Sequence, residues 1–126
     1  MPRNARLDEE GALHHVVFRG IEKRKIFFEH EDYTGFVHRL SKILTSTNTA
    51  LLAWSLLPNH GHLFLRSGAC GLSTVMRRLL TGHVVAFNRK YKRVGHLMQN
   101  RFGSTLVDSD QYFLNVLAYV HLNPIL

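Results

Sequence analysis

Two histidines separated by a single residue, His60 and His62, are the side chains in this sequence best placed to do chemistry. They lie in the run Leu57-Pro-Asn-His-Gly-His-Leu-Phe-Leu65, whose apolar residues predict a buried strand. Alternate side chains of a strand share a face, so both imidazoles point one way while Leu63 and Leu65 point into a core. Imidazole is a poor core filler unless its nitrogens find partners. The pair therefore suggests a metal site, although this spacing alone is a weak signal.

A divalent-metal site that is open to substrate takes about three protein ligands. The carboxamide oxygen of Asn123 can add a third ligand to the two histidines. A tyrosine beside such a metal can attack a phosphodiester and form a phosphotyrosyl intermediate. Tyr112 and Tyr119 are both candidates, and spacing alone leaves open which is the nucleophile or whether both are buried structural tyrosines.

The size and charge of the chain limit the classes of protein it can be. Its 126 residues predict one domain, and 16 Lys and Arg against nine Asp and Glu give a net charge of +7. This balance favours a polyanionic partner. Residues 1–11 are charged rather than signal-like, and no segment is apolar enough to span a bilayer, so we expect a cytoplasmic protein without a membrane partner. The single Cys70 excludes an internal disulfide and a cysteine-built zinc site.

Periodicity and turn residues predict the elements that must position these side chains. Strands are expected at 13–19, 49–57, 60–65 and 104–107, and helices at 32–45, 72–89 and 111–122. The order β-α-β-β-α-β, followed by a helix, predicts an α+β fold with a small antiparallel sheet and helices packed mainly on one face.

Two stretches concentrate positive charge. Lys23, Arg24 and Lys25 form a triplet in a predicted loop, and residues 88–93 are the densest basic run, interrupted by the aromatic Tyr91. Basic residues around an aromatic ring suit phosphate contacts combined with base stacking. An exposed helix end, whose cations complement the helix dipole, explains the second run equally well.

A set of short motifs resembles those of the single-strand tyrosine transposases of the HUH endonuclease superfamily, most closely the REP-associated transposases. The similar stretches occur in family order and span nearly the whole chain. They are 14–20 (HHVVFRG), 26–28 (IFF), 32–33 (DY), 57–63 (LPNHGHL), 87–88 (FN), 95–99 (GHLMQ), Arg101, Ser104 and 119–124 (YVHLNP).

This resemblance assigns roles that spacing leaves open. It implies that His60 and His62 are paired metal ligands, that Tyr119 is the nucleophile, and that Asn123 is the additional ligand one helical turn later, with Mg²⁺ or Mn²⁺ as the metal. It also implies a ferredoxin-like or RRM-like domain that cuts and rejoins single-stranded, hairpin-containing DNA. The products would be a 5′-phosphotyrosyl link and a free 3′-hydroxyl. The candidate DNA contacts are Arg19, Lys23, Arg24, Arg89, Lys90, Lys92, Arg93 and Arg101.

The sequence departs from the family pattern in two places. Gly61 replaces the usual bulky residue between the histidines, which predicts a loss of core packing on the opposite face. The chain, taken as one catalytic domain over residues 1–126, also ends at Leu126, where relatives usually continue. A C-terminal DNA-binding segment, or activity itself, would then be missing.

Three hypotheses follow. The first is a metal-dependent single-strand DNA nickase and strand transferase. The second is a catalytically inactive, domesticated protein that binds hairpin DNA through its basic surface. The third, a small zinc hydrolase, is suggested because imidazole also suits zinc, but the sequence places no obvious general base next to the histidines. The sequence leaves open whether the protein acts as a monomer or a homodimer.

Overall fold

The computed structural model describes residues 10–99, 102–107 and 114–115. Its elements are β1 (Leu13–Arg19), the 3₁₀ turn η1 (Ile21–Lys23), α2 (His30–Thr47), β2 (Ala50–Leu57), β3 (His60–Arg66), α3 (Leu72–Lys90) and β4 (Gly103–Leu106). This order confirms the predicted strands and the first two helices, with bounds that differ by at most two residues. The predicted helix 111–122 lies outside the described residues except for Leu114 and Asn115, which are helical.

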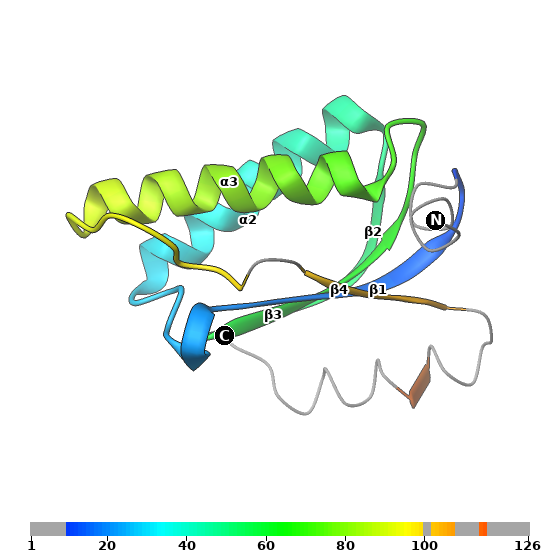
Figure 1. The fold of residues 1–126 in the computed structure, drawn as a ribbon. Helices are drawn as coiled ribbons and strands as arrows, with labels where there is room; N and C mark the ends of the chain where they lie inside the picture. Colours follow the sequence, from blue (N-terminus) through cyan, green and yellow to red (C-terminus); the bar gives the residue numbers. More distant parts are fainter. Residues whose placement is uncertain (1–9, 100–101, 108–113, 116–126) are drawn as a thin grey trace.

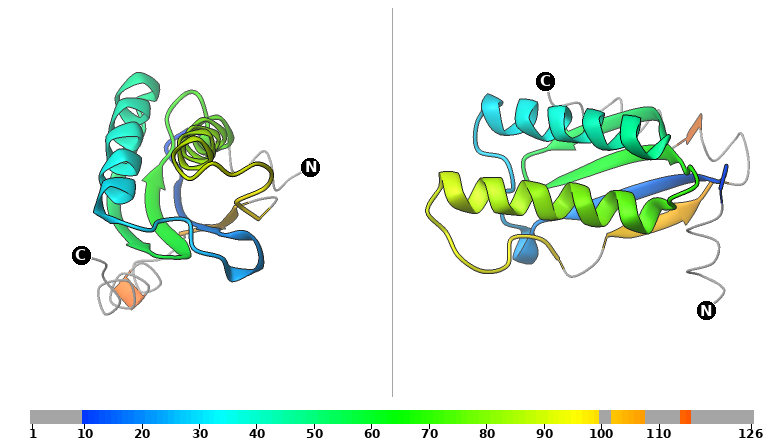
Figure 2. Two further views of the ribbon diagram at one scale, coloured as in Figure 1. Left: turned by 90° about the vertical axis from the view of Figure 1, so that its left-hand side faces the viewer. Right: turned by 90° about the horizontal axis from the view of Figure 1, so that it is seen from above.

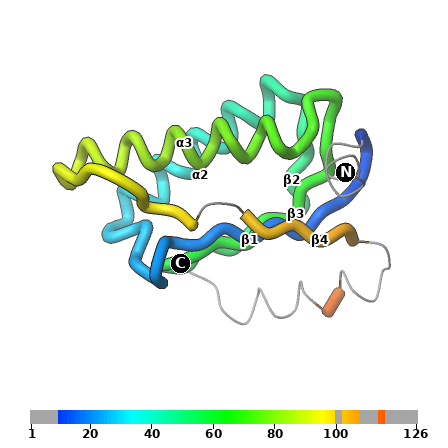
Figure 3. Tube along the Cα trace, viewed as in Figure 1, coloured from blue at the N-terminus to red at the C-terminus, as the bar shows by residue number. Residues whose placement is uncertain are grey.

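The four strands form one antiparallel sheet in the order β2-β3-β1-β4. This is the ferredoxin-like arrangement, so the predicted α+β fold is confirmed. Helices α2 and α3 pack against each other over one face of the sheet (Figures 1 and 2). The tube view shows β1 crossing the molecule beside β3, with β4 on its other side (Figure 3). None of the helices in the described part of the chain is long and apolar enough to cross a membrane.

The core lies between the sheet and the two helices. From the strands it receives Val16, Phe18, Leu63 and Leu65, and from the helices it receives Phe36, Leu40, Leu72, Val75, Met76 and Leu79, among others. Alternation explains the contribution of each strand, because buried and less buried residues alternate along β1. The same alternation leaves a second set of β1 and β3 side chains on the face opposite the helices.

Gly61 does not leave the gap in the core that the sequence predicts. Phe18 lies directly opposite Gly61 in the β1–β3 register, and its ring fills the space where a side chain would be. A Cβ atom built on Gly61 would lie 2.3 Å from Phe18 Cζ. Phe18 is 1 % exposed and packs on the Phe36 ring of α2, with centroids 5.3 Å apart. The small residue on β3 is therefore matched by a large one on β1, and the expectation of lost packing is wrong.

The N-terminus of α2 is closed by a reciprocal cap. The Asp32 carboxylate accepts hydrogen bonds from the backbone N–H groups of Phe28 (2.8 Å) and Glu29 (3.1 Å). The Glu29 side chain in turn accepts a hydrogen bond from the backbone N–H of Asp32, which completes a capping box. These bonds satisfy donors that have no partner inside the helix. The cap also gathers acidic groups at the end of α2 that lies beside the C-terminal end of α3.

Candidate functional site

His60 and His62 lie at the start of β3 on the face of the sheet opposite the helices, as the strand alternation predicts. Their ring centroids are 5.1 Å apart and the ring planes cross at 77°. His60 is half-buried, whereas His62 is 7 % exposed. The two imidazoles are therefore neighbours on one face, which is the arrangement that two ligands of one metal ion require. Their role as ligands stays a prediction.

The ring of His60 is held by the residue that precedes it. Asn59 Oδ1 lies 2.8 Å from His60 Nδ1, and Asn59 Nδ2 donates to the backbone carbonyl of Lys23 at 3.4 Å. Because the amide nitrogen faces a carbonyl, its oxygen faces the imidazole and accepts a hydrogen bond from Nδ1–H. The lone pair of His60 is then on Nε2, the nitrogen that a metal would bind. In the sequence Asn59 stands out only as part of the motif at 57–63, which does not predict that it holds His60.

The ring of His62 is held by a third histidine, His15 of β1. His15 Nε2 and His62 Nδ1 are 3.0 Å apart, and the two ring planes differ by 11°. His15 also stacks on Phe64, with centroids 4.9 Å apart. His15 lies in the motif at 14–20, but no role at the site was predicted for it. The available signal was its position four residues before Arg19 on a predicted strand, which puts both residues on one face.

All three imidazoles are shifted toward the neutral form. Burial lowers the pKa of His15, and burial followed by the nearby charge of Arg19 lowers the pKa of His60. The pKa of His62 falls to about 4, chiefly through burial and then through His15, His60 and Arg19. These shifts favour the neutral form of each ring at neutral pH. Neutral imidazole is the form that binds a metal ion, so the environment suits ligation.

The histidine pair fits a metal ion as part of a ligand set. In each ring Nδ1 lies at hydrogen-bonding distance from a neighbouring side chain, His15 for His62 and Asn59 for His60. Metal-ligating histidines usually bind the metal through one nitrogen and make such a hydrogen bond with the other. Within the described residues, no group of three or more His, Cys, Asp and Glu side chains is placed to hold a metal. The predicted carboxamide ligand Asn123 and the tyrosines Tyr112 and Tyr119 lie outside the described residues.

A basic loop lies beside the histidines. Residues 20–26 hydrogen-bond through their backbone to the turn before β3, with Gly20 N–H donating to Asn59 O at 2.9 Å. Exposed Lys23 and Arg24 are on this loop, and the Lys23 carbonyl holds Asn59. The loop is thereby tied to the residue that orients His60.

A further cation stands next to the pair. Arg19 is exposed and lies opposite His60 in the β1–β3 register, on the same face of the sheet. Three predicted DNA contacts, Arg19, Lys23 and Arg24, thus lie at the histidine end of the sheet. Arg101, a fourth, lies outside the described residues.

Comparison with known proteins places this chain in a family. The family model described as "Transposase IS200 like" matches residues 10–123. The chain belongs to the IS200-like transposase family. No curated protein matches this transposase. Membership implies single-strand DNA transposase or endonuclease activity.

Two solved structures share the fold of this IS200-like transposase. A REP-associated tyrosine transposase, solved bound to a REP hairpin, has a TM-score of 0.73 and 16 % identity, over 91 % of this chain and 67 % of that chain. A crystal structure of a putative transposase from Deinococcus radiodurans has a TM-score of 0.62 and 14 % identity, over 90 % of this chain and 92 % of that chain. Both likenesses agree with the ferredoxin-like sheet.

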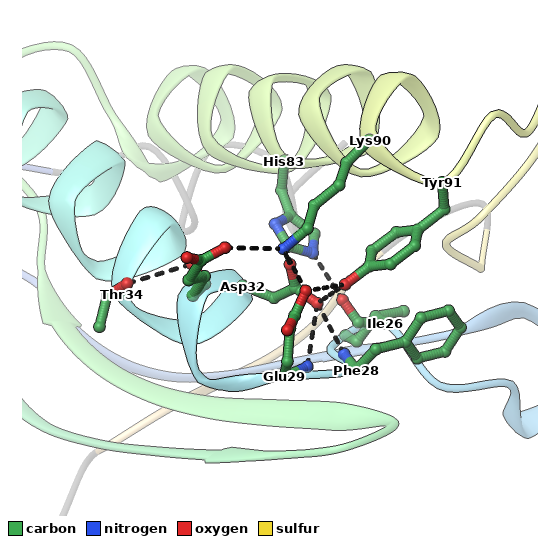
Figure 4. A network of polar contacts seen from close by, with 9 residues as sticks. Ile26, Phe28, Glu29, Asp32, Thr34, His83, Lys90 and Tyr91 are labelled. Carbon is green, nitrogen blue, oxygen red and sulfur yellow. Dashed lines mark hydrogen bonds and ion pairs between the residues drawn. The ribbon is translucent and has the colours of Figure 1, made fainter.

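The basic end of α3 in the transposase is engaged differently from the loop beside the histidines. Lys90 Nζ lies 2.7 Å from Glu29, 3.3 Å from Glu31 and 2.9 Å from Asp32 (Figure 4). The hydrogen bond to Glu29, followed by that to Asp32, raises the pKa of Lys90 well above its usual range. The Tyr91 hydroxyl donates to Asp32 at 2.6 Å. Lys90 and Tyr91 therefore join α3 to the cap of α2, which gives this part of the run a structural explanation.

The remaining cations of the run differ in their surroundings. Arg93 donates to Asn88 Oδ1 at 2.8 Å and to the His96 carbonyl at 3.3 Å, so it is partly occupied within its own loop. Arg89 and Lys92 are exposed. Their predicted contacts with DNA stay predictions.

Proposed function

We propose that this IS200-like transposase cuts and rejoins single-stranded, hairpin-containing DNA through a 5′-phosphotyrosine intermediate. His60, His62 and Asn123 would hold Mg²⁺ or Mn²⁺, and Tyr119 would be the nucleophile. The observation that carries the proposal is the pairing of His60 and His62 on one face, each with Nδ1 held by a neighbour. The assignments of Tyr119 and Asn123 rest on the family motif at 119–124.

The bound divalent ion would supply the positive charge that polarises the scissile phosphate. Tyr119 Oη forms a bond to phosphorus while the bond from phosphorus to the 3′-oxygen breaks. The phenol gives its proton to solvent, and the leaving 3′-oxygen takes one up. In the reverse step a 3′-hydroxyl attacks the phosphotyrosine, which restores Tyr119 and rejoins a strand. Free tyrosine has a pKa of about 10, so the phenol needs activation at neutral pH.

DNA as the partner is supported by two lines of evidence. The chain carries a net charge of +7, and Arg19, Lys23 and Arg24 lie at the histidine end of the sheet. A protein of similar fold was solved bound to a REP hairpin. Phosphate contacts from these side chains would position the strand over the histidine face. The active protein would be a monomer or a homodimer.

The decisive experiment is detection of the covalent adduct. Hairpin oligonucleotides with single-stranded flanks are incubated with the protein and Mn²⁺, and the adduct is mapped by mass spectrometry of the peptides. We expect it on Tyr119. Tyr119→Phe keeps the ring and deletes only the attacking oxygen, so the adduct should vanish, whereas Tyr112→Phe should retain it. An adduct mapped to Tyr112 or Tyr91 contradicts the assignment, and hairpin binding without any adduct favours the inactive DNA-binding protein.

A further inference from the structure

His15 reaches the histidine pair from a different strand. In the antiparallel β1–β3 register Val17 lies opposite His62 and His15 lies opposite Phe64, so His15 is diagonal to His62 on the same face. Its ring is fixed against Phe64, with a centroid distance of 4.9 Å and an interplanar angle of 17°. The neighbouring strand therefore brings a third imidazole to the edge of the proposed metal site and holds its orientation.

The contact between the two rings is a hydrogen bond between nitrogens. His15 Nε2 and His62 Nδ1 are 3.0 Å apart, while the ring centroids are 5.3 Å apart and the planes are nearly parallel. This geometry places the rings edge to edge, with the two nitrogens facing each other. One of the two nitrogens must carry the shared proton and the other must accept it.

The position of that proton decides whether His62 can bind a metal through Nε2. A neutral imidazole has one protonated nitrogen and one lone pair. When His62 Nδ1 carries the proton and donates to His15, the lone pair of His62 is on Nε2. When His15 is the donor instead, the proton of His62 moves to Nε2, and that nitrogen cannot be a ligand. Only the first tautomer supports the proposed metal site.

We propose that His15 is a positioning residue for His62: it accepts the hydrogen bond from His62 Nδ1–H and so fixes the ring orientation and tautomer that present Nε2 to the metal. This inference rests on the proposed function. Asn59 has the corresponding task at His60, with an amide oxygen in place of an imidazole nitrogen. Each ligand on β3 thereby has its own acceptor, one from the adjacent turn and one from β1. Such outer partners of metal ligands typically contribute about 10- to 100-fold in metal affinity.

His15 is better suited to this task than to ligation. Its Nε2 faces the His62 ring nitrogen at hydrogen-bonding distance, so that atom is directed at His62. Among the described residues, His15, His60 and His62 do not form a three-ligand metal group. His15 therefore acts through His62.

Calorimetric titration of the full chain with Mn²⁺ at one fixed pH tests the proposal. His15→Phe keeps an aromatic ring against Phe64 but removes the acceptor, so we expect Mn²⁺ affinity to fall at least about tenfold. His15→Gln offers an amide oxygen as acceptor and should stay within a few-fold of wild type. His14→Phe is the matched control, because His14 lies on the helix-covered face and bonds Ser104 at 3.0 Å. It should leave the affinity unchanged.

A second measurement reads the tautomer itself. Nitrogen-15 NMR of the histidine rings with Mg²⁺ present should show the proton of His62 on Nδ1 in the wild type. In His15→Phe the Nε2-protonated form should gain population, which a loss of packing alone would not produce. The wild-type spectrum is informative even when a variant fails to fold.

The outcomes separate this inference from the proposed function. Wild-type affinity in His15→Phe together with weakened binding in His62→Ala overturns the positioning role and leaves the metal site standing. A wild-type His62 protonated on Nε2 also overturns it. Failure of the wild type to bind Mn²⁺, or binding unaffected by His62→Ala, overturns the metal site and this inference together.

Discussion

The two faces of β3 are built from alternate residues of one strand, yet they depend on different interactions. On the helix side, Gly61, Leu63 and Leu65 pack in the core, and Phe18 fills the space over the glycine. On the other side, His60 Nδ1 donates a hydrogen bond to Asn59 Oδ1, and His62 Nδ1 lies at hydrogen-bonding distance from His15 Nε2. One face is fixed by tight packing and the other by directed polar contacts. The packed face supplies the rigid support that a precise site needs.

A similar contrast separates two groups of cations. Lys90 is surrounded by three carboxylates at the cap of α2, so its charge is balanced within the protein. Arg19 is exposed beside two neutral histidines, and no ion pair to it is found among the described residues. Lys90 and Arg19 carry the same formal charge, but only that of Arg19 is left available to attract a DNA phosphate. Local charge density in the sequence does not reveal this difference.

The largest difference should appear between substitutions on the two faces of β3. His62→Ala should abolish DNA cleavage and leave the melting temperature nearly unchanged, because the ring contributes chemistry rather than packing. Leu63→Ala, one residue away on the packed face, should cost about 2–5 kcal/mol of unfolding free energy and retain cleavage where the protein stays folded. Thermal melts and cleavage assays on both variants check this. A collapse of stability in His62→Ala would make that histidine structural.

The next effect concerns the match between Gly61 and Phe18. Gly61→Leu forces a side chain into the Phe18 ring and should destabilise the fold by about 1–3 kcal/mol. Phe18→Ala alone should cost about 3–5 kcal/mol. The double variant should be more stable than the sum of the single effects by about 0.5–3 kcal/mol, because the leucine occupies the vacated space. Denaturant titration of the four proteins gives this coupling, and strict additivity would contradict the packing account.

A smaller effect should distinguish the two groups of cations. If about five phosphates are contacted, log affinity for single-stranded DNA should fall with log salt with a slope of about −3.5. Arg19→Gln should reduce the size of this slope by about 0.7, the contribution of one phosphate. Lys90→Gln removes the same charge but one already paired with carboxylates, so the slope should not change. Equal changes in both variants would show that only net charge matters.

The smallest effect concerns His83, a buried histidine on the helix side whose Nε2 donates to the Ile26 carbonyl at 2.7 Å. Burial lowers its pKa, as does Arg39, while the bond to Ile26 and the charge of Asp32 oppose this. The unfolded chain therefore binds a proton at this histidine more readily than the folded protein does. The stability contributed by the neutral ring is fully present above the unfolded pKa of about 6.5, and it is lost as pH falls through the lower pKa of the folded state. Unfolding free energies at pH 7 and pH 5 should therefore differ less in His83→Gln than in the wild type. An equal pH dependence in the wild type and His83→Gln would show that His83 does not contribute to it.

Much of the fold could be predicted from local patterns. Alternation in 13–19 and 60–65 and the helical period in 32–45 and 72–89 located the strands and helices to within two residues. These patterns are reliable here because each depends on the side chains of one element facing one core. The predicted helix 111–122, with Tyr119 and Asn123, lies almost wholly outside the described residues, so its part of the site stays a prediction.

The sequence by itself determined that His60 and His62 share a face, since residues two apart on a strand always do. It also placed the chain in its family through motifs that follow one another in order. Only the tertiary structure decided which side chains meet them: His15 reaches His62 across 47 residues, and Lys90 reaches Asp32 across 58. Strand register and helix docking set these contacts, and both depend on the packing of the whole chain rather than on any local period.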